Sequence, residues 1–284
     1  SLQERVGAGT VGGGGGRSPG KLVAEVLAAH RDVGVCGGDF VGDVHGIDVI
    51  VRQFPFVGFA GDRARGIRDR KKRGEGNREF VVKEMEIKRG VMEIIENLLF
   101  GDNVTYLQCS KCKVKLSSVD TIVLHGTVGA GAISSALYLC RPDTSVSAHV
   151  VVGRDAEIFQ LLPFDVKAWH AGKSFHVGRV NLNDCSIGIE LDNAGELQRV
   201  GDRYYSCFGR EYSPDQVYTT EEEGRARYWH SFTEGQFAVT EEICRLLKAC
   251  YGIKYLVRHS DITPRKTDPG PAFPFDELRK RLKF

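Results

Sequence analysis

The chain has 284 residues, enough for one large domain or for one domain with an appendage. Its formal net charge of +2 is too small to require an anionic partner, so we expect no nucleic-acid partner. No apolar run approaches the roughly 20 residues that span a bilayer, and the first residues lack the pattern of a secretory signal, so we expect no membrane partner.

The eight cysteines do not form the dense framework of a disulfide-stabilised chain. Several lie in apolar, core-like stretches, namely Cys140, Cys185, Cys244 and Cys250. We therefore predict buried free thiols in a reducing compartment and, with no secretory signal, a cytoplasmic protein. A phage-encoded lysin, or a secreted protein with a different natural N-terminus, is the alternative.

The first 84 residues differ in character from the rest. They include the glycine-rich stretch GAGTVGGGGGRSPG and the basic stretch GDRARGIRDRKKRGEGNREF. Glycine tracts lose much backbone entropy on ordering, and a charged segment broken by glycines buries little surface. We predict a poorly ordered extension over 1–84, with a short helix at 21–30 and a strand at 49–59, followed by one domain over 85–284.

The basic stretch over 61–80 has eight Lys or Arg residues against four Asp or Glu residues. Such a run is compatible with a nucleic-acid or localisation patch. Aromatic residues are not interleaved with the charges, as base stacking would require. A solvated linker is therefore the favoured interpretation.

Helix and strand patterns begin at residue 91. Apolar residues at helical spacing predict an amphipathic helix over 91–99. The run TIVLH predicts a strand over 121–125, and SSALYLC predicts a helix over 134–140. Two apolar runs around a Gly-Arg-Asp-Ala turn predict a β-hairpin over 149–163.

The C-terminal part continues with alternating strands and helices. SIGIEL predicts a strand over 186–191 with its apolar residues on one face and, on the other, Ser186, Gly188 and Glu190. The clearest helix is expected within 232–252, where Thr233 and Gln236 have the spacing of a capping box. KYLVRH predicts a strand that ends on a histidine. Together these elements indicate an α/β or α+β domain, a central mixed β-sheet flanked by helices.

The stretch VRHSDITPRKTDPGPAFPF over 257–275 contains a histidine, a lysine and an aspartate among several prolines. Proline fixes φ and lacks an N–H donor, and the residue before it avoids helical geometry. We therefore predict a stiff loop that holds His259, Lys266 and Asp268 at fixed separations.

Two predicted strands end on histidines, His125 and His259, and the stiff loop adds Asp268. Two imidazoles and one carboxylate leave the fourth tetrahedral position of a zinc ion open, as in catalytic zinc sites. Histidines are common, however, and for each one alone a structural role is the simpler interpretation.

Four stretches, in this order, carry a resemblance to a known family: TIVLHGT, SAHVVVGRDAEIFQLLPFDVKAWHAGKS, CSIGIELDN and RHSDITPRKTDPGPAF. Over 91–282 the chain resembles the zinc-dependent N-acetylmuramoyl-L-alanine amidases of the peptidoglycan recognition superfamily. The branch that it resembles most is the cytoplasmic muropeptide-recycling one, whose third ligand is aspartate.

The resemblance implies a role for each matching residue. His125, His259 and Asp268 match the zinc ligands, Glu190 the catalytic glutamate, and Lys266 the lysine near the reacting carbonyl. It implies hydrolysis of the amide between N-acetylmuramic acid and L-alanine, with Glu190 activating a zinc-bound water and with zinc and Lys266 stabilising the oxyanion. Expected contacts to the peptidoglycan or muropeptide substrate are Trp169, His170, Ala171 and His149.

A non-catalytic peptidoglycan-binding module is the second hypothesis, since family members that lose a ligand only bind. A zinc ribbon at Cys109 and Cys112 is disfavoured because no second cysteine pair has the required spacing. We expect His176 and His230 at the surface, and a hairpin beside the cleft within 194–231. We expect a monomer.

Overall fold

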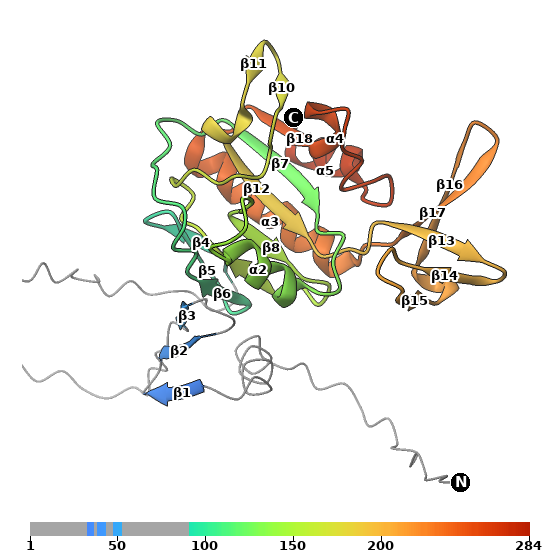
Figure 1. Ribbon diagram of the computed structural model, residues 1–284. Helices are drawn as coiled ribbons and strands as arrows, with labels where there is room; N and C mark the ends of the chain where they lie inside the picture. Colours follow the sequence, from blue (N-terminus) through green and yellow to red (C-terminus); the bar gives the residue numbers. More distant parts are fainter. Residues whose placement is uncertain (1–32, 37–38, 44–47, 53–90) are drawn as a thin grey trace, which may run out of the picture.

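The computed structural model describes residues 91–284 in full and, before them, the strands β1 (Val33–Cys36), β2 (Asp39–Asp43) and β3 (Asp48–Arg52) (Figure 1). The expected helix at 21–30 and the glycine-rich and basic stretches lie outside the described residues. Strand β3 overlaps the first residues of the strand predicted over 49–59, and Val51 and Arg52 pair with Leu107 and Tyr106. The N-terminal segment therefore contributes three strands to the main sheet, which its composition did not indicate.

The main sheet has nine strands in the order β1-β2-β3-β6-β9-β8-β12-β7-β18. Strands β8, β12, β7 and β18 run parallel to their neighbours in this group, whereas β8 and β9 form the predicted antiparallel hairpin. This confirms the expected mixed sheet. The bounds are β6 (Val104–Leu107), β7 (Thr121–Gly126), β8 (Val150–Val152), β9 (Ile158–Gln160), β12 (Ser186–Leu191) and β18 (Tyr255–Arg258).

Helices cover both faces of the sheet (Figure 1). Helices α3 (Glu234–Tyr251) and α5 (Phe275–Leu282) pack on one face, where the apolar side of β12 meets a core that includes Val239, Ile243 and Leu278. Helix α2 (Ala132–Cys140) packs on the other face against Val151 and Phe159. Each fully buried large apolar side chain contributes about 1.5–3 kcal/mol, so these two clusters hold the layers together.

The N-terminus of α3 has the predicted capping box. The Gln236 N–H donates to Thr233 Oγ1 and the Thr233 N–H donates to Gln236 Oε1, each at 3.1 Å. The pair satisfies two of the amide groups that a helix start leaves without intrahelical partners. It fixes the point at which the chain enters the helix.

The predicted helix over 91–99 is wrong. The chain forms a hairpin of β4 (Glu93–Ile95) and β5 (Leu98–Phe100), with Ile94 opposite Leu99 and Ile95 opposite Leu98. Its two turn residues have φ of 49° and 68°, the second being Asn97, a residue type that tolerates the left-handed region. The same apolar spacing fits a helix face or two paired strands, and tertiary packing decides for the strands.

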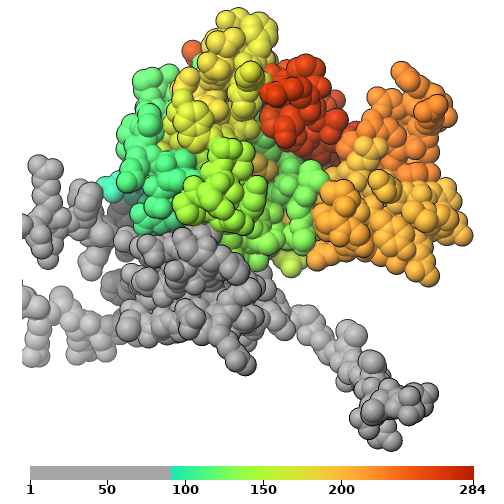
Figure 2. Space-filling model, in the orientation of Figure 1, coloured from blue at the N-terminus to red at the C-terminus, as the bar shows by residue number. Residues whose placement is uncertain are grey.

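Residues 196–230 form a second, five-stranded antiparallel sheet, the insertion lobe, which stands out from the body in Figure 2. The expected hairpin is its pair β16–β17. The strands are β13 (Glu196–Val200), β14 (Arg203–Tyr205), β15 (Glu211–Tyr212), β16 (Val217–Glu222) and β17 (Arg225–His230). The remaining short elements are β10 (Phe175–His176), β11 (Arg179–Val180) and α4 (His259–Ile262).

Helix α4 is one turn long and directly follows β18, so the predicted stiff loop begins with a helical turn and becomes irregular only where its prolines start. Among the described helices, none is long and apolar enough to cross a membrane.

Candidate metal centre

The candidate site lies at one end of the parallel strands. In the register of β7 and β12, Glu190 is opposite His125, so their side chains share one face of the sheet. Strand β18 pairs with the other side of β7 and leads directly into His259, the first residue of α4. Carboxyl ends of adjacent parallel strands meet at one edge, which is why residues 134 positions apart come together.

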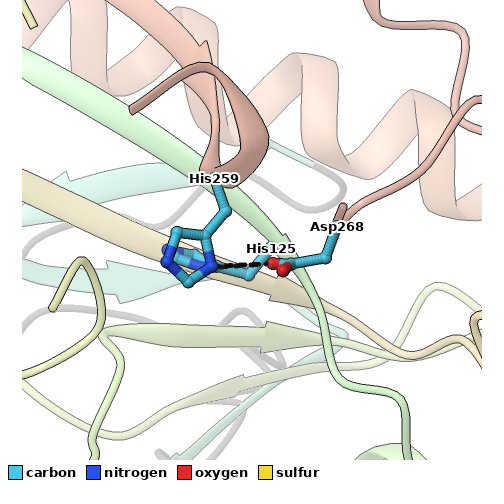
Figure 3. A group of neighbouring side chains, drawn as sticks. All are labelled: His125, His259 and Asp268. Carbon is cyan, nitrogen blue, oxygen red and sulfur yellow. Dashed lines mark hydrogen bonds and ion pairs between the residues drawn. The ribbon is translucent and has the colours of Figure 1, made fainter. Parts of the chain in front are cut away.

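Three of the predicted residues point toward one another in Figure 3. The Nδ1 atoms of His125 and His259 are 3.0 Å apart, and Asp268 Oδ2 lies 3.0 Å from His259 Nδ1 and 3.4 Å from His125 Nδ1. Both histidines are buried, and the carboxylate is mostly so. Among the described residues, they form the one His/Cys/Asp/Glu group arranged to hold a metal ion.

The donor set fits a divalent ion of the zinc type. Two imidazole nitrogens and a carboxylate oxygen are usual zinc ligands, and ligand distances of 2.0–2.1 Å around a tetrahedral ion give edges of about 3.3 Å. The three separations of 3.0, 3.0 and 3.4 Å are close to that edge. Three electron-rich atoms this close together require a cation or a proton between them, and the described residues supply only three of the four ligands of a tetrahedral ion.

Electrostatics favour the metal-binding protonation states of His125 and Asp268. Burial lowers the pKa of His125 to about 4, against the opposing effect of the adjacent Asp268 carboxylate. For Asp268, burial alone would raise the pKa, but the adjacent rings of His125 and His259 hold it well below its usual range. At neutral pH the His125 imidazole is neutral and the carboxylate is ionised, as ligation requires.

Glu190 and Lys266 flank this group. Burial, together with the nearby Asp268 charge, raises the pKa of the Glu190 carboxyl to about 8, against the opposing effect of the Lys266 ammonium. Glu190 is partly exposed, whereas Lys266 is exposed in the loop before Asp268. A carboxyl whose pKa lies near neutrality, next to a possible metal ion, has the property expected of a general base.

A pocket of about 490 Å³ opens beside the donor set. Gly126 and Asp268 line one side, and the insertion lobe supplies the other with Glu196, Leu197 and Trp229. Gly270, with φ of +85°, lets Trp229 approach the loop, because a Cβ there would lie 3.0 Å from Trp229 Cε3. The segment 194–231 therefore lies beside the cleft, as expected, and contacts the loop that carries Asp268.

Not all of the expected substrate contacts reach the surface. Trp169 is 48% exposed, and the Lys167 ammonium lies 4.4 Å from the centre of its ring. His149 and Ala171 are fully buried, so the structure does not support them as substrate contacts. His170 is 8% exposed, and both of its ring nitrogens are bonded within the protein. Burial depends on tertiary partners, which motif position does not reveal.

Two further histidines were expected at the surface. His230 is buried, with Nδ1 accepting from the Ala194 N–H at 3.1 Å, so that expectation is wrong. His176 is partly buried and packs edge-on against Tyr255 at 5.2 Å. Cys109 and Cys112 are buried free thiols.

His149 makes the folded protein less stable as the solution becomes acidic. Its Nε2 donates to the Val166 carbonyl at 2.8 Å and its Nδ1 accepts from the Gly188 N–H at 3.0 Å, so both ring nitrogens are used in the neutral form. Burial lowers its pKa from 6.5 to about 4. Because the folded pKa is depressed, the unfolded state binds the proton first, and stability is lost as the pH falls below 6.5.

We expect the His149 term to remove about 2 kcal/mol of unfolding free energy between pH 7 and pH 5. Urea unfolding of the metal-free protein at both pH values measures the total loss. Between pH 7 and pH 5, the variant His149→Gln should lose about 2 kcal/mol less unfolding free energy than the unmodified protein. An identical pH dependence in both proteins would contradict the prediction.

The fold and the site define a mixed α/β protein with a buried His-His-Asp donor set and a glutamate whose pKa lies near neutrality. The chain belongs to the N-acetylmuramoyl-L-alanine amidase family (Amidase_2), which matches residues 115–271.

Several known proteins are similar to this chain. The 1,6-anhydro-N-acetylmuramyl-L-alanine amidase AmpD of Escherichia coli (strain K12) is 36% identical over 137 residues, 47% of this chain and 57% of AmpD. The N-acetylmuramoyl-L-alanine amidase AmiD of the same strain is 33% identical over 173 residues, 57% of this chain and 53% of AmiD. The chain thus spans little more than half the length of these curated relatives.

Solved structures give a similar result. A crystal structure of AmpD matches with a TM-score of 0.48 and 25% identity, and the match covers 66% of this chain and 98% of the AmpD chain. A complex of E. coli AmiD with anhydro-N-acetylmuramic acid-L-Ala-D-gamma-Glu-L-Lys matches with a TM-score of 0.45 and 28% identity. This match covers 67% of this chain and 65% of the AmiD chain.

Proposed function

We propose that this chain hydrolyses the amide bond between N-acetylmuramic acid and L-alanine in peptidoglycan fragments, with one zinc ion held by His125, His259 and Asp268. The observation that carries the proposal is the approach of three donor atoms to within 3.0–3.4 Å at the end of the parallel strands. Family membership supplies the reaction class.

When bound, zinc would supply Lewis acidity, which polarises a carbonyl and lowers the pKa of a water molecule. Each protein group then has one task. His125 and His259 present their Nδ1 lone pairs, and the Asp268 carboxylate balances the charge. Glu190 accepts the proton of the attacking water and returns it to the leaving amine of L-alanine. The Lys266 ammonium, two residues before Asp268, would stabilise negative charge on the carbonyl oxygen.

We further propose that the substrate is a muropeptide of the anhydro type. AmpD is named for a 1,6-anhydro substrate and the AmiD complex holds an anhydro-muramoyl peptide, which supports this substrate class. The pocket of about 490 Å³ is within the usual range for a small ligand. One wall comes from the insertion lobe, which would then influence which fragments enter.

The cell compartment and the oligomeric state belong to the same proposal. Seven cysteines in the described part of the chain are free, four of them buried, which supports a reducing compartment such as the cytoplasm. We propose a monomer, and sedimentation velocity at micromolar concentration measures this directly.

The competing reading is a recognition module that binds a muropeptide without cleaving it. Incubation of a defined anhydro-muropeptide with the zinc-loaded protein, followed by mass spectrometry, distinguishes the two. We expect release of the free peptide with an N-terminal L-alanine, and its loss when a chelator is added. Stoichiometric zinc and bound but intact muropeptide would instead establish the recognition module.

Replacing Lys266 with methionine is expected to lower kcat about 100-fold, because one donor to the developing oxyanion is removed. Zinc content should not change, since Lys266 is not among the three donor residues. The exposed Lys280 in α5 gives a control of the same chemistry, Lys280→Met, which should retain full activity. An unchanged kcat in Lys266→Met would remove this residue from the mechanism.

A further inference from the structure

His125 is the first member of a chain of hydrogen bonds that runs away from the candidate metal centre. Its Nε2 lies 3.0 Å from His170 Nδ1, and His170 Nε2 lies 3.2 Å from Ser186 Oγ. Ser186 Oγ in turn lies 2.5 Å from the Leu182 carbonyl oxygen. All three side chains are at least 90% buried, so solvent does not compete for these bonds.

The hydrogen bond between Ser186 and Leu182 determines which group donates in each of the other bonds. A carbonyl oxygen only accepts, so the Ser186 hydroxyl must donate to Leu182. With its one proton used, Ser186 Oγ must accept from His170 Nε2–H. The His170 ring is buried, and its two nitrogens bond to an imidazole and a hydroxyl instead of to a carboxylate that would stabilise a second ring proton, so this imidazole is neutral and its Nδ1 is an acceptor. That acceptor can be satisfied only by His125 Nε2–H.

The consequence concerns the opposite side of the His125 ring. A neutral imidazole carries one proton, and His170 selects the tautomer in which that proton is on Nε2. The lone pair of His125 Nδ1 then points at His259 Nδ1 and Asp268 Oδ2, the other two donor atoms. These hydrogen bonds therefore set both the tautomer and the ring orientation of His125 that metal ligation needs.

Strand β12 provides the position of Ser186 and the space for the His170 ring in this series of hydrogen bonds. The face of β12 opposite the α3 core carries Ser186, Gly188 and Glu190 in succession, beside His125 on β7. The His170 ring lies directly over Gly188, where a Cβ would come within 2.4 Å of His170 Cγ. A side chain at position 188 would displace the ring, so the glycine is needed for close approach.

We propose that His170 and Ser186 are positioning residues that fix the His125 tautomer for metal binding, with Gly188 as the space that the His170 ring requires. This rests on the proposed function only in taking His125 as a zinc ligand. It assigns to His170 a role inside the protein instead of the substrate contact that the sequence resemblance implied. Residues that orient a ligand in this way typically change metal affinity 10–100-fold when removed.

The test is the zinc dissociation constant, measured by competition with a chromophoric chelator at pH 7. We expect His170→Ala and Gly188→Ala to bind zinc about 10–100-fold more weakly than the unmodified chain. His170→Asn retains an acceptor toward His125 and should recover most of the affinity. Ser186→Ala should weaken binding less than His170→Ala, because it removes the far end of the chain.

Leu182→Ala is the matched control. The Leu182 side chain is fully buried next to Ala171, so its loss should lower the melting temperature, but the backbone carbonyl that accepts from Ser186 remains. We expect normal zinc affinity in this variant. Nitrogen-15 NMR of the metal-free protein adds a direct readout, with the His125 proton expected on Nε2 even before zinc occupies Nδ1.

A folded His170→Ala protein with unchanged zinc affinity would overturn the positioning role while leaving the proposed hydrolase intact. A His125 proton found on Nδ1 would do the same. Failure of the unmodified chain to bind zinc at all would overturn the proposed function itself, and the positioning role with it.

Discussion

Glu190→Gln is expected to lower kcat about 10²–10⁴-fold, the usual effect of removing a general base. Glutamine keeps the size of the side chain and its place opposite His125 in the sheet, but its amide takes up no proton at neutral pH. Zinc content should stay at one per chain, because Glu190 is not among the three donor residues. Parallel measurement of kcat, zinc content and melting temperature tests all parts of this expectation.

Glu157→Gln is a suitable control for Glu190→Gln. Burial also raises the pKa of Glu157, so both substitutions replace a carboxyl of raised pKa with an amide. Glu157 accepts from the Asp155 N–H in the turn before β9 and does not line the pocket. Full activity is expected in the control. If Glu190→Gln retained the activity of the control, another group would have to take the proton.

Much of this site is predictable from local pattern. The alternation in SIGIEL separates Ile187, Ile189 and Leu191, which are buried in the core, from Ser186, Gly188 and Glu190 on the opposite face. Strand ends that carry histidines predict which residues meet, because parallel pairing aligns the strand ends at one edge. The three predicted donor residues do lie together, and their role as ligands stays a prediction.

The parts that the sequence did not predict depend on contacts between distant segments. Four apolar residues over 94–99 fit a helix, but they pair across a turn whose signal is Asn97. Strand β3 joins the sheet through β6, about fifty residues further along. His149 and His230 are buried because of partners that no local pattern identifies, Val166 and Ala194.

The link between His170 and strand β12 has the same origin. Its contacts with Ser186 and Gly188 join residues 16 and 18 positions apart, and neither residue type by itself suggests a metal site. A glycine on the polar face of a strand is nevertheless a detectable signal, since glycine weakens a strand unless something approaches closely. Here the approaching group is an imidazole that bonds to a candidate ligand.

Zinc should stabilise this protein strongly, and the loss of one donor should abolish that effect. A ligand that binds only the folded state adds about 4 kcal/mol to the unfolding free energy at a thousand times its dissociation constant. In Asp268→Asn the carboxylate that lies 3.0 Å from His259 Nδ1 becomes a neutral amide, a poor zinc ligand. We expect the zinc-dependent increase in urea-unfolding free energy to fall below about 1 kcal/mol in this variant.

Asp261→Asn separates ligation from a simple change of charge. Asp261 lies in the one-turn helix that starts at His259 and pairs with Arg258 on the exposed side, so its substitution removes the same charge without touching the donor atoms. This control should keep the full stabilisation by zinc. Equal stabilisation of Asp268→Asn and the unmodified chain would mean that zinc binds without the third donor, and the site would then have to be rebuilt around other residues.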